Sequence, residues 1–308
     1  MAVIGMGPIG IEMAQALARL GVEVHGYATK ELLGGLSDPS VNVELRQALE
    51  AELTLHIGDE ATLHAAEGGG IEVRSGAHRV VVDQVLAAIG RRPNLDGLGL
   101  DTLGVALNER GLPEALNPNS MQVGDLPVYL AGDANNKHPL LHEAVDEGHM
   151  AGMNAMADKP TCFQRRTPLA IVFSEPGSAV VGQGFAALQK KSEQDGLQVA
   201  TGAVNFARHG RARAGQRNDG RLCVYADKAT GRLLGAELCA PAGEHMAHLL
   251  ALAVGQKMTV AGLLGMPFYH PVLEEGLRTA LRDAARQLDL KAGSDLAGCE
   301  AIGAPALE

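Results

Sequence analysis

The sequence Gly5-Met6-Gly7-Pro8-Ile9-Gly10 follows a short apolar segment and precedes a stretch whose apolar residues recur at helical spacing. It therefore places a GxGxxG pattern between a predicted strand and a predicted helix. In that position the first glycine permits a tight turn, the second lets the backbone approach a pyrophosphate, and the third lets the helix pack on the strand. The helix N-terminus adds free N–H groups and partial positive charge. The pattern alone occurs often by chance, but in this context it predicts that Gly5, Gly7 and Gly10 bind a dinucleotide.

The end of the second predicted strand bears on which dinucleotide is bound. An acidic residue usually holds the ribose hydroxyls there. In this chain the segment Tyr27–Lys30 contains no carboxylate, and the first acid after it is Glu31. The missing acid, with Lys30 close by, favours a 2′-phosphate and hence NADP. Lys30 is equally well explained as a solvated loop residue, so the sequence leaves NAD or NADP open.

Strand and helix patterns continue outward from the turn. Alternation of this kind predicts an α/β fold with an open parallel sheet, in a Rossmann-like NAD(P)-binding domain over residues 1–92. Further along this segment the predicted elements are a helix at 45–53 and strands at 53–56, 71–74, 79–82 and 85–89, the last ended by Gly90.

The rest of the chain divides into three predicted regions. Residues 93–160 are rich in Gly, Pro and Asn, with a predicted strand at 128–131 and a helix at 141–157. Residues 161–290 form a C-terminal α+β domain, with predicted strands at 171–173, 222–226 and 233–238 and helices at 244–253 and 271–288. The Gly- and Ala-rich tail at 291–308 carries no pattern and is predicted to be disordered.

Composition excludes several classes of protein. The chain has 308 residues, enough for about two domains, and a net charge of −10, which argues against a nucleic-acid partner. No apolar stretch approaches the ~20 residues that span a bilayer, and no signal-peptide pattern opens the chain, so we expect no membrane contact. The cysteines, Cys162, Cys223, Cys239 and Cys299, form no CxxC pair. We therefore expect no metal site and reduced thiols in a cytoplasmic protein.

Several short segments follow one another along the chain in a characteristic order. They are residues 5–24, 85–94 (VLAAIGRRPN), 128–133 (VYLAGD), 139–148 (PLLHEAVDEG), 168–182 and 270–275 (HPVLEE). In this order they resemble the class I pyridine nucleotide-disulfide oxidoreductases, over nearly all the chain to about residue 290. Residues 266–271 (MPFYHP) are similar to the dihydrolipoamide dehydrogenase group of that family rather than to mercuric reductases, which lack this His and end in paired cysteines.

The resemblance implies a homodimeric, FAD-dependent enzyme that uses NAD or NADP. Electrons pass between a dithiol or disulfide substrate, such as lipoamide, and the nicotinamide, through a cysteine pair and the flavin. A His–Glu pair from the other subunit handles the proton. Residues 93–160 would then be the C-terminal part of the FAD-binding domain, and residues 161–290 the dimerisation domain.

The resemblance also implies the residues that contact the cofactors. Three of these residues also have a simpler explanation. Asp133 can be a helix or turn cap, His142 an ordinary surface residue, and Glu12 a complement to the helix dipole. The implied nicotinamide-nucleotide residues are Gly5, Gly7, Pro8, Ile9, Gly10, Glu12 and Gly90. The implied flavin residues are Asp133, Pro139, Leu140, Leu141 and His142.

His270 and Glu275 are the candidate catalytic residues. We predict that Pro271 occupies the first position of a helix, with His270 just before it and Glu275 near the helix start. A carboxylate that orients one ring nitrogen leaves the other free to exchange a proton with a thiol. That suits a base that converts a dithiol into its nucleophilic thiolate. Alone, a His before a helix is more often a cap or packing residue, and Glu274 is an alternative partner.

The chain departs from the family pattern in three respects. It contains no earlier glycine motif for FAD and no Cys-x4-Cys pair, and Pro8 replaces an aromatic residue that some members carry. We therefore expect that this chain alone neither holds FAD nor reduces lipoamide. We also expect that the apolar strand at 128–131 lacks neighbours and exposes its sides.

Three other functions stay open. A non-catalytic NAD(P)-binding and dimerisation module would bind nucleotide without flavin colour or turnover. A two-domain dehydrogenase would use His270 as the base on a hydroxy acid and transfer hydride without flavin. A glutathione reductase-like enzyme would share the fold and differ in the substrate-binding residues.

Overall fold

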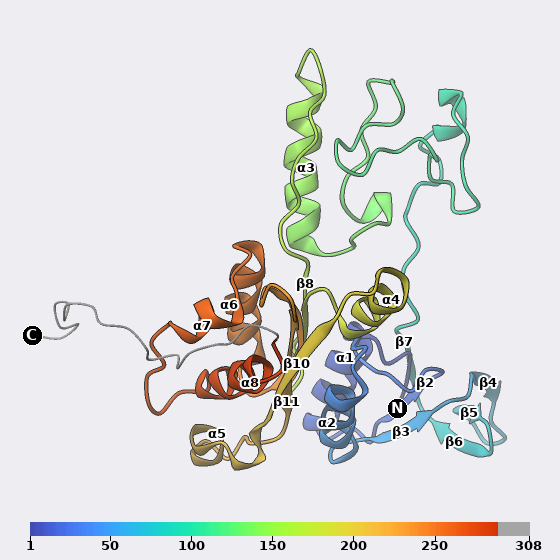
Figure 1. Cartoon of the computed structure of the whole chain (residues 1–308). Coiled ribbons are helices and arrows are strands. Elements are labelled where there is room, and N and C mark those ends of the chain that lie inside the picture. Colours follow the sequence, from blue (N-terminus) through green and yellow to red (C-terminus); the bar gives the residue numbers. More distant parts are fainter. Residues whose placement is uncertain (289–308) are drawn as a thin grey trace, which may run out of the picture. The chain divides into compact units, whose positions relative to one another are not determined.

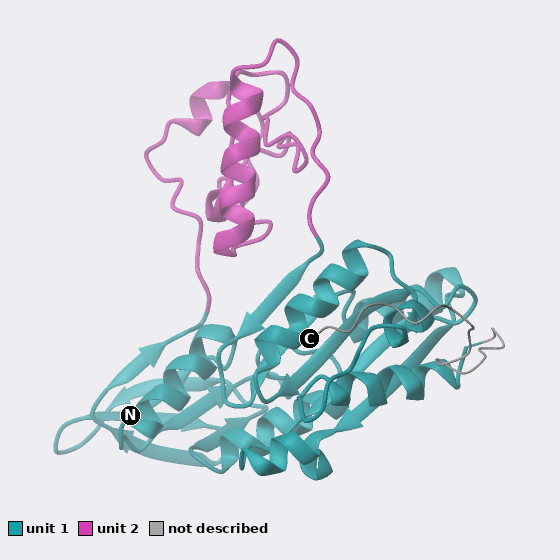
Figure 2. Ribbon diagram, turned by 90° about the vertical axis from the view of Figure 1, so that its left-hand side faces the viewer, with its two compact units in different colours: residues 1–89, 167–308 teal, residues 90–166 magenta. Residues whose placement is uncertain are grey.

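The computed structural model of the chain describes residues 1–288 (Figure 1). These residues divide into two compact units (Figure 2). Unit 1 contains residues 1–89 and, among the described residues, 167–288; unit 2 contains residues 90–166. The tail predicted at 291–308 lies outside the described residues.

Unit 1 begins with a four-stranded parallel sheet in the order β3-β2-β1-β7. Pro8 occupies the first turn of α1, and the Asp38 side chain caps α2 by accepting a hydrogen bond from the Ser40 N–H at 2.8 Å. Both helices bury an apolar face, so the predicted parallel α/β fold is confirmed. The elements are β1 (Ala2–Ile4), α1 (Pro8–Arg19), β2 (His25–Ala28), α2 (Pro39–Glu50), β3 (Thr54–Ile57) and β7 (Val85–Ala87).

A three-stranded antiparallel sheet is inserted between β3 and β7. It consists of β4 (Ala61–Ala65), β5 (Ile71–Ser75) and β6 (His78–Val82). Sequence analysis missed β4 because it is short, most of its residues are exposed, and its two alanines are weak strand formers. The buried residues Val73 and Val82 of this sheet pack with Ala2 and Tyr27 of the parallel sheet.

The C-terminal part of unit 1 is an antiparallel sheet in the order β10-β11-β12-β9-β8, and its α+β character is confirmed. Helices α6 and α8 pack on this sheet around the largest apolar cluster. The helix predicted from Pro271 begins only at Glu275, so residues 270–274 form turns before it. The elements are β8 (Leu169–Val172), β9 (Gly177–Gly182), α4 (Phe185–Asp195), β10 (Val199–Asn205), η3 (Phe206–Arg208), α5 (Gly210–Ala214), β11 (Arg221–Asp227), β12 (Leu233–Ala240), α6 (Gly243–Gly255), α7 (Val260–Leu264) and α8 (Glu275–Ala285).

A buried carboxylate joins the C-terminal antiparallel sheet to the start of α2. Glu237 of β12 is fully buried and accepts hydrogen bonds from the backbone N–H groups of Ser37 at 2.7 Å, Asp38 at 2.8 Å and Phe185 at 2.8 Å. The Tyr225 hydroxyl donates to Asp38 at 2.8 Å. The start of α2 is therefore fixed to β11 and β12 by groups nearly 200 residues apart.

Unit 2 is largely irregular, with one long helix, α3 (Leu141–Ala155), and the short helices η1 (Leu100–Leu103) and η2 (Gly132–Asn135). The predicted strand at 128–131 does not form, since Tyr129 makes only a single bridge to Gln122. Leu130 is buried in a small apolar cluster within the unit, so this segment is less exposed than expected. Exposed apolar side chains lie instead on α3, where Leu141, Val145 and Met153 face outward.

Candidate nucleotide pocket and catalytic pair

The three glycines of the turn differ in what surrounds them. Gly5 has a φ of +96°, and a Cβ there would lie 2.5 Å from the Ala88 carbonyl oxygen. A Cβ on Gly10 would lie 1.8 Å from the Gly5 carbonyl oxygen, whereas one on Gly7 would meet nothing within 4 Å. Gly5 and Gly10 are therefore required by close backbone packing. Gly7 leaves open space beside the N-terminus of α1, where a pyrophosphate needs close approach to the backbone.

A cavity of about 940 Å³ opens beside this turn in unit 1. Gly5, Gly7 and Pro8 line it, together with residues from the end of β2 and from the segment around Asp59. Its size lies within the range of ligand pockets, roughly 300–1,000 Å³. The turn, the free helix N-terminus and the open space at Gly7 fit the phosphates of a dinucleotide. The other lining residues are Ile4, Met6, Tyr27, Ala28, Thr29, Lys30, Leu32, Leu33, Gly34, Gly35, Leu36, Glu60, Ala61, Leu63, Val85, Ala87, Ala88 and Ile89.

Four of the predicted nucleotide residues do not line this cavity. Ile9 and Gly10 lie further along α1, where Gly10 packs against the Gly5 backbone. Glu12 is the fifth residue of α1, beyond its first turn, and accepts a hydrogen bond from the Phe173 N–H at 2.9 Å. Gly90 follows β7 with a φ of +109° and belongs to unit 2.

The predicted flavin-contacting residues all lie in unit 2. Asp133 is in η2, half exposed, and forms an ion pair with Arg91 at 3.1 Å. Residues 139–142 are exposed at the start of α3, and no side chain caps that helix. Its first N–H groups are therefore open to a ligand with negative charge.

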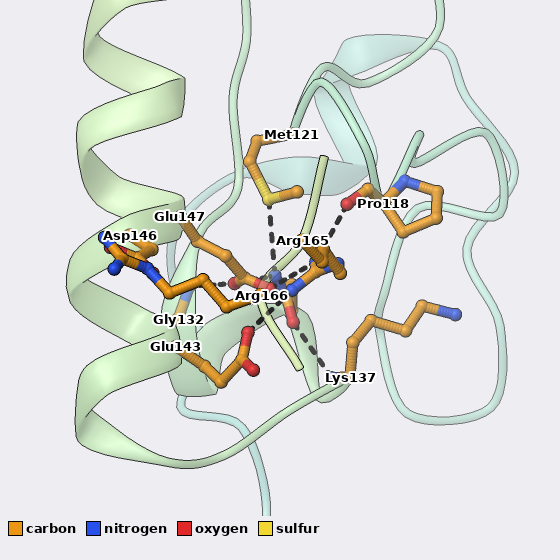
Figure 3. Close-up of polar contacts among 10 residues, drawn as sticks. Pro118, Met121, Gly132, Lys137, Glu143, Asp146, Glu147, Arg165 and Arg166 are labelled. Carbon is orange, nitrogen blue, oxygen red and sulfur yellow. Dashed lines mark hydrogen bonds and ion pairs between the residues drawn. The ribbon is translucent and has the colours of Figure 1, made fainter. Parts of the chain in front are cut away.

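Glu147, to which sequence analysis assigns no role, organises this part of unit 2 (Figure 3). It is fully buried, and its Oε2 accepts from the Gly132 N–H at 2.7 Å and from the Asn135 amide at 2.5 Å. Arg165 donates to Glu147 at 2.6 Å and to Glu143 at 3.0 Å. These bonds hold η2, and with it Asp133, against α3. The signal in the sequence was an acid at a core-facing helical position, which a buried partner must neutralise.

The structure brings His270 and Glu275 together. His270 Nδ1 lies 3.0 Å from Oε1 and 3.1 Å from Oε2 of Glu275, and this hydrogen bond lowers the pKa of the Glu275 carboxyl. Because a carboxylate only accepts hydrogen bonds, Nδ1 carries the proton and Nε2 is left for exchange. The His270 side chain is 79% exposed. The turn at 270–274, rather than a helical start, brings the pair into contact.

Two models of one protein family match the chain. The pyridine nucleotide-disulphide oxidoreductase model matches residues 1–148, and the dimerisation domain of the same family matches residues 169–281. The chain belongs to the class I pyridine nucleotide-disulfide oxidoreductase family. Enzymes of this family use FAD and NAD(P).

Similar proteins of known function include dihydrolipoyl dehydrogenases and a mercuric reductase. Dihydrolipoyl dehydrogenase of Thermus scotoductus is 35% identical, in a match covering 92% of this chain and 62% of the relative. Mercuric reductase of Acidithiobacillus ferrooxidans is 29% identical, covering 97% of this chain and 53% of the relative. The chain thus spans between about half and three fifths of the length of these relatives.

Solved structures show the same fold. The HOCl-induced flavoprotein disulfide reductase RclA of Escherichia coli superposes with a TM-score of 0.79 at 21% identity, over 91% of this chain and 64% of that one. In the described part of this chain, no helix has the length and apolar character needed to cross a membrane.

Proposed function

We propose that this chain forms the NAD(P)-binding part, a portion of the flavin-binding part and the dimerisation part of a dihydrolipoyl dehydrogenase. The observation that carries the proposal is the His270–Glu275 pair, an oriented imidazole with one free ring nitrogen at an exposed position. The similarity to the dihydrolipoyl dehydrogenases of Thermus scotoductus and Bacillus subtilis, 35% and 31% identical, supports the choice of dihydrolipoamide as substrate.

His270 would act as the acid–base group. Glu275 holds Nδ1, so Nε2 can take a proton from a dithiol and return it to the thiolate. A thiolate is the form that attacks a disulfide, and proton removal is what this chain supplies. The exposure of His270 fits a site completed by a second subunit, so we propose a homodimer.

The cofactors would be held by the residues described above. The glycine turn and cavity would hold NAD(P), and Asp133 with the free start of α3, including His142, would face FAD. When bound, these groups carry the electrons between the dithiol and the nicotinamide. The four cysteines without a CxxC pair support a reducing, cytoplasmic location as part of the proposal.

Nucleotide binding and dimerisation can be tested on the purified chain. Titration calorimetry with NADH and NADPH should show one binding site per chain, and sedimentation velocity should show a dimer. Failure to bind either nucleotide would overturn the pocket assignment. A monomer at all concentrations would overturn the homodimer.

The reaction is tested by NADH oxidation with lipoamide in the presence of FAD. The chain is assayed alone and after co-expression with the part of the Thermus scotoductus relative that it does not cover. We expect flavin absorbance and turnover only in the co-expressed form. His270→Gln should lower turnover by about 10²–10⁴-fold and leave NADH binding unchanged.

The other outcomes decide between the alternatives. Unchanged turnover in His270→Gln would contradict the acid–base role. Faster reaction with glutathione disulfide than with lipoamide would assign the enzyme to the glutathione reductases. NADH binding without flavin colour or turnover in either form would favour the non-catalytic module.

A further inference from the structure

The geometry of the His270–Glu275 pair depends on where helix α8 begins. Glu275 is the first residue of α8, and its carboxylate accepts hydrogen bonds from His270 Nδ1 at 3.0 Å and from the Val272 N–H at 3.3 Å. The His270 side chain is 79% exposed, so little packing holds the ring itself. The orientation of the ring therefore depends on Glu275, and the position of Glu275 depends on what packs against the first turn of α8.

A phenylalanine ring from a distant part of the sequence packs against that turn. Gly276 follows Glu275 and is buried, and a Cβ on it would lie 2.8 Å from Cε1 and 2.9 Å from Cζ of Phe206. Carbon atoms in contact lie about 3.5–4.0 Å apart, so the ring leaves no room for a methyl group. Glycine is a weak helix former, and the close approach of this ring explains why the position holds one.

The Phe206 ring has no free space into which it could move. It is fully buried in the largest apolar cluster of unit 1, which includes Leu277 and Leu281 of α8, and protein interiors of this kind are close-packed. The His209 ring lies beside it, with the ring centroids 5.4 Å apart. The backbone is fixed as well, because the Phe206 N–H donates to the Gly220 carbonyl at 2.9 Å. Phe206 is thus a rigid surface for the first turn of α8.

The hydrogen bond between His270 and Glu275 tolerates little displacement. A Cβ at position 276 would have to move roughly 0.7 Å, from 2.8 Å to an ordinary carbon–carbon distance. Positions 275 and 276 are adjacent in one helical turn and move together. The same shift of Glu275 away from His270 would lengthen their 3.0 Å contact to about 3.7 Å, which is no longer a hydrogen bond.

We propose that Phe206 is a positioning residue for the acid–base pair: its ring, packed on the Gly276 backbone, fixes the first turn of α8 and so holds Glu275 where it orients His270. This inference rests on the proposed acid–base role of His270 and deepens it. It gives a part in that role to a residue that β11, β12, α6 and α7 separate from the pair in the sequence.

The first measurement is the tautomer of His270 in the complete chain, by nitrogen-15 NMR at about pH 8.5, where an ordinary imidazole is neutral. In the unsubstituted protein the proton should lie on Nδ1, because Glu275 accepts its hydrogen bond. In Gly276→Ala the ring should populate both tautomers. The double variant Phe206→Leu/Gly276→Ala should restore the Nδ1 proton, because leucine lacks the two ring atoms that the added methyl group would meet.

The second measurement is NADH oxidation with lipoamide by the co-expressed form. Gly276→Ala should lower kcat by about 10- to 100-fold, the effect of misplacing a catalytic group by about 1 Å, with little change in KM for lipoamide. The double variant should recover most of this loss. Leu250→Val is the control, because it perturbs the same apolar cluster from α6. It should lower the melting temperature and leave both the tautomer and kcat unchanged.

A proton that stays on Nδ1 in Gly276→Ala overturns the inference, and so does a double variant that resembles Gly276→Ala. A tautomer change in Leu250→Val as well would show that any loss of stability disturbs the pair, which also overturns it. If the tautomer responds as described and no form reduces lipoamide, the positioning role stands and the proposed function fails.

Discussion

The carbonyl oxygen of Gly5 lies against the Cα of Gly10, so that a Cβ on Gly10 would be 1.8 Å from that oxygen. This contact brings the first turn of α1 onto the end of β1. It is the physical reason that the third glycine of the motif has no substitute. Gly10 therefore serves the packing of helix on strand. Gly7, which has open space beside it, is the position left for a ligand.

Gly10→Ala should destabilise the protein by about 2–3 kcal/mol or more, because backbone atoms must move to admit the methyl group. Urea unfolding followed by circular dichroism measures this change. Stability within error of the unsubstituted protein would show that the helix and strand separate freely, contrary to the close packing described above.

Gly7→Ala should leave stability nearly unchanged and weaken nucleotide binding. Its added Cβ meets no protein atom within 4 Å, so the free energy of unfolding should change by no more than about 1 kcal/mol, the scale of an N-cap substitution. The affinity for NADH should fall, because the methyl group occupies space that the pyrophosphate requires. Calorimetry and urea unfolding of the same preparation test both parts, and undiminished affinity would contradict the placement of the phosphates.

Glu147→Ala should destabilise unit 2 by about 3 kcal/mol, because it leaves the Gly132 N–H, the Asn135 amide and part of Arg165 without their acceptor. Hydrogen exchange of the α3 amides measures the loss. Asp146→Ala is the control on the same helix. Its pair with Arg166 is exposed on the arginine side, so the loss should be much smaller than that of Glu147→Ala. Equal protection in both variants would contradict the organising role of Glu147.

Because of His56, the free energy of unfolding should decrease as the pH is lowered below about 6.5, the ordinary pKa of histidine. Burial of this ring, followed by the nearby His25 and His78, lowers the pKa of His56 in the folded protein. The unfolded chain therefore binds more protons than the folded one as the pH drops from about 6.5 toward the folded pKa, and the free energy of unfolding decreases over that interval. Paired carboxylates such as Glu275 act only at lower pH.

Urea unfolding of His56→Phe between pH 7.5 and 5.5 isolates this effect, because the variant keeps a buried ring and loses the titration. Its stability should depend less on pH than that of the unsubstituted protein. Burial also lowers the pKa of His209, but His209 is present in both proteins and cancels in the comparison. Two parallel curves would contradict the assignment to His56.

Local patterns in the sequence were enough to predict much of the fold. The glycine turn, α1 and β7 follow from apolar spacing and from residues that only a turn accommodates. Where the pattern was weak, prediction failed. The exposed β4 is short and contains two alanines, which are weak strand formers, and the apolar segment 128–131 lacks the neighbouring strands that would make it a strand.

The candidate site divides in the same way. The spacing of His270 and Glu275 in the sequence predicts that they interact, and the structure brings them to hydrogen-bonding distance. The sequence did not predict that the helix starts at Glu275 rather than at Pro271. The exact first residue of a helix is difficult to predict, because turn and helical conformations of the terminal residues differ little in energy. The hydrogen bond from the Phe173 N–H to Glu12 could not be predicted either, because the two residues lie 161 positions apart in the sequence and no local pattern connects them.

By itself, the sequence determined the glycine turn, the parallel strands around it and the pairing of His270 with Glu275, because each depends on near neighbours and on backbone conformation. The tertiary structure alone decided that Glu147 is neutralised by Arg165, that Glu237 joins β12 to the start of α2, and that the Tyr27 hydroxyl is buried without a partner among the described residues. These depend on which distant groups the packed interior brings together, and on which polar atoms it then fails to satisfy.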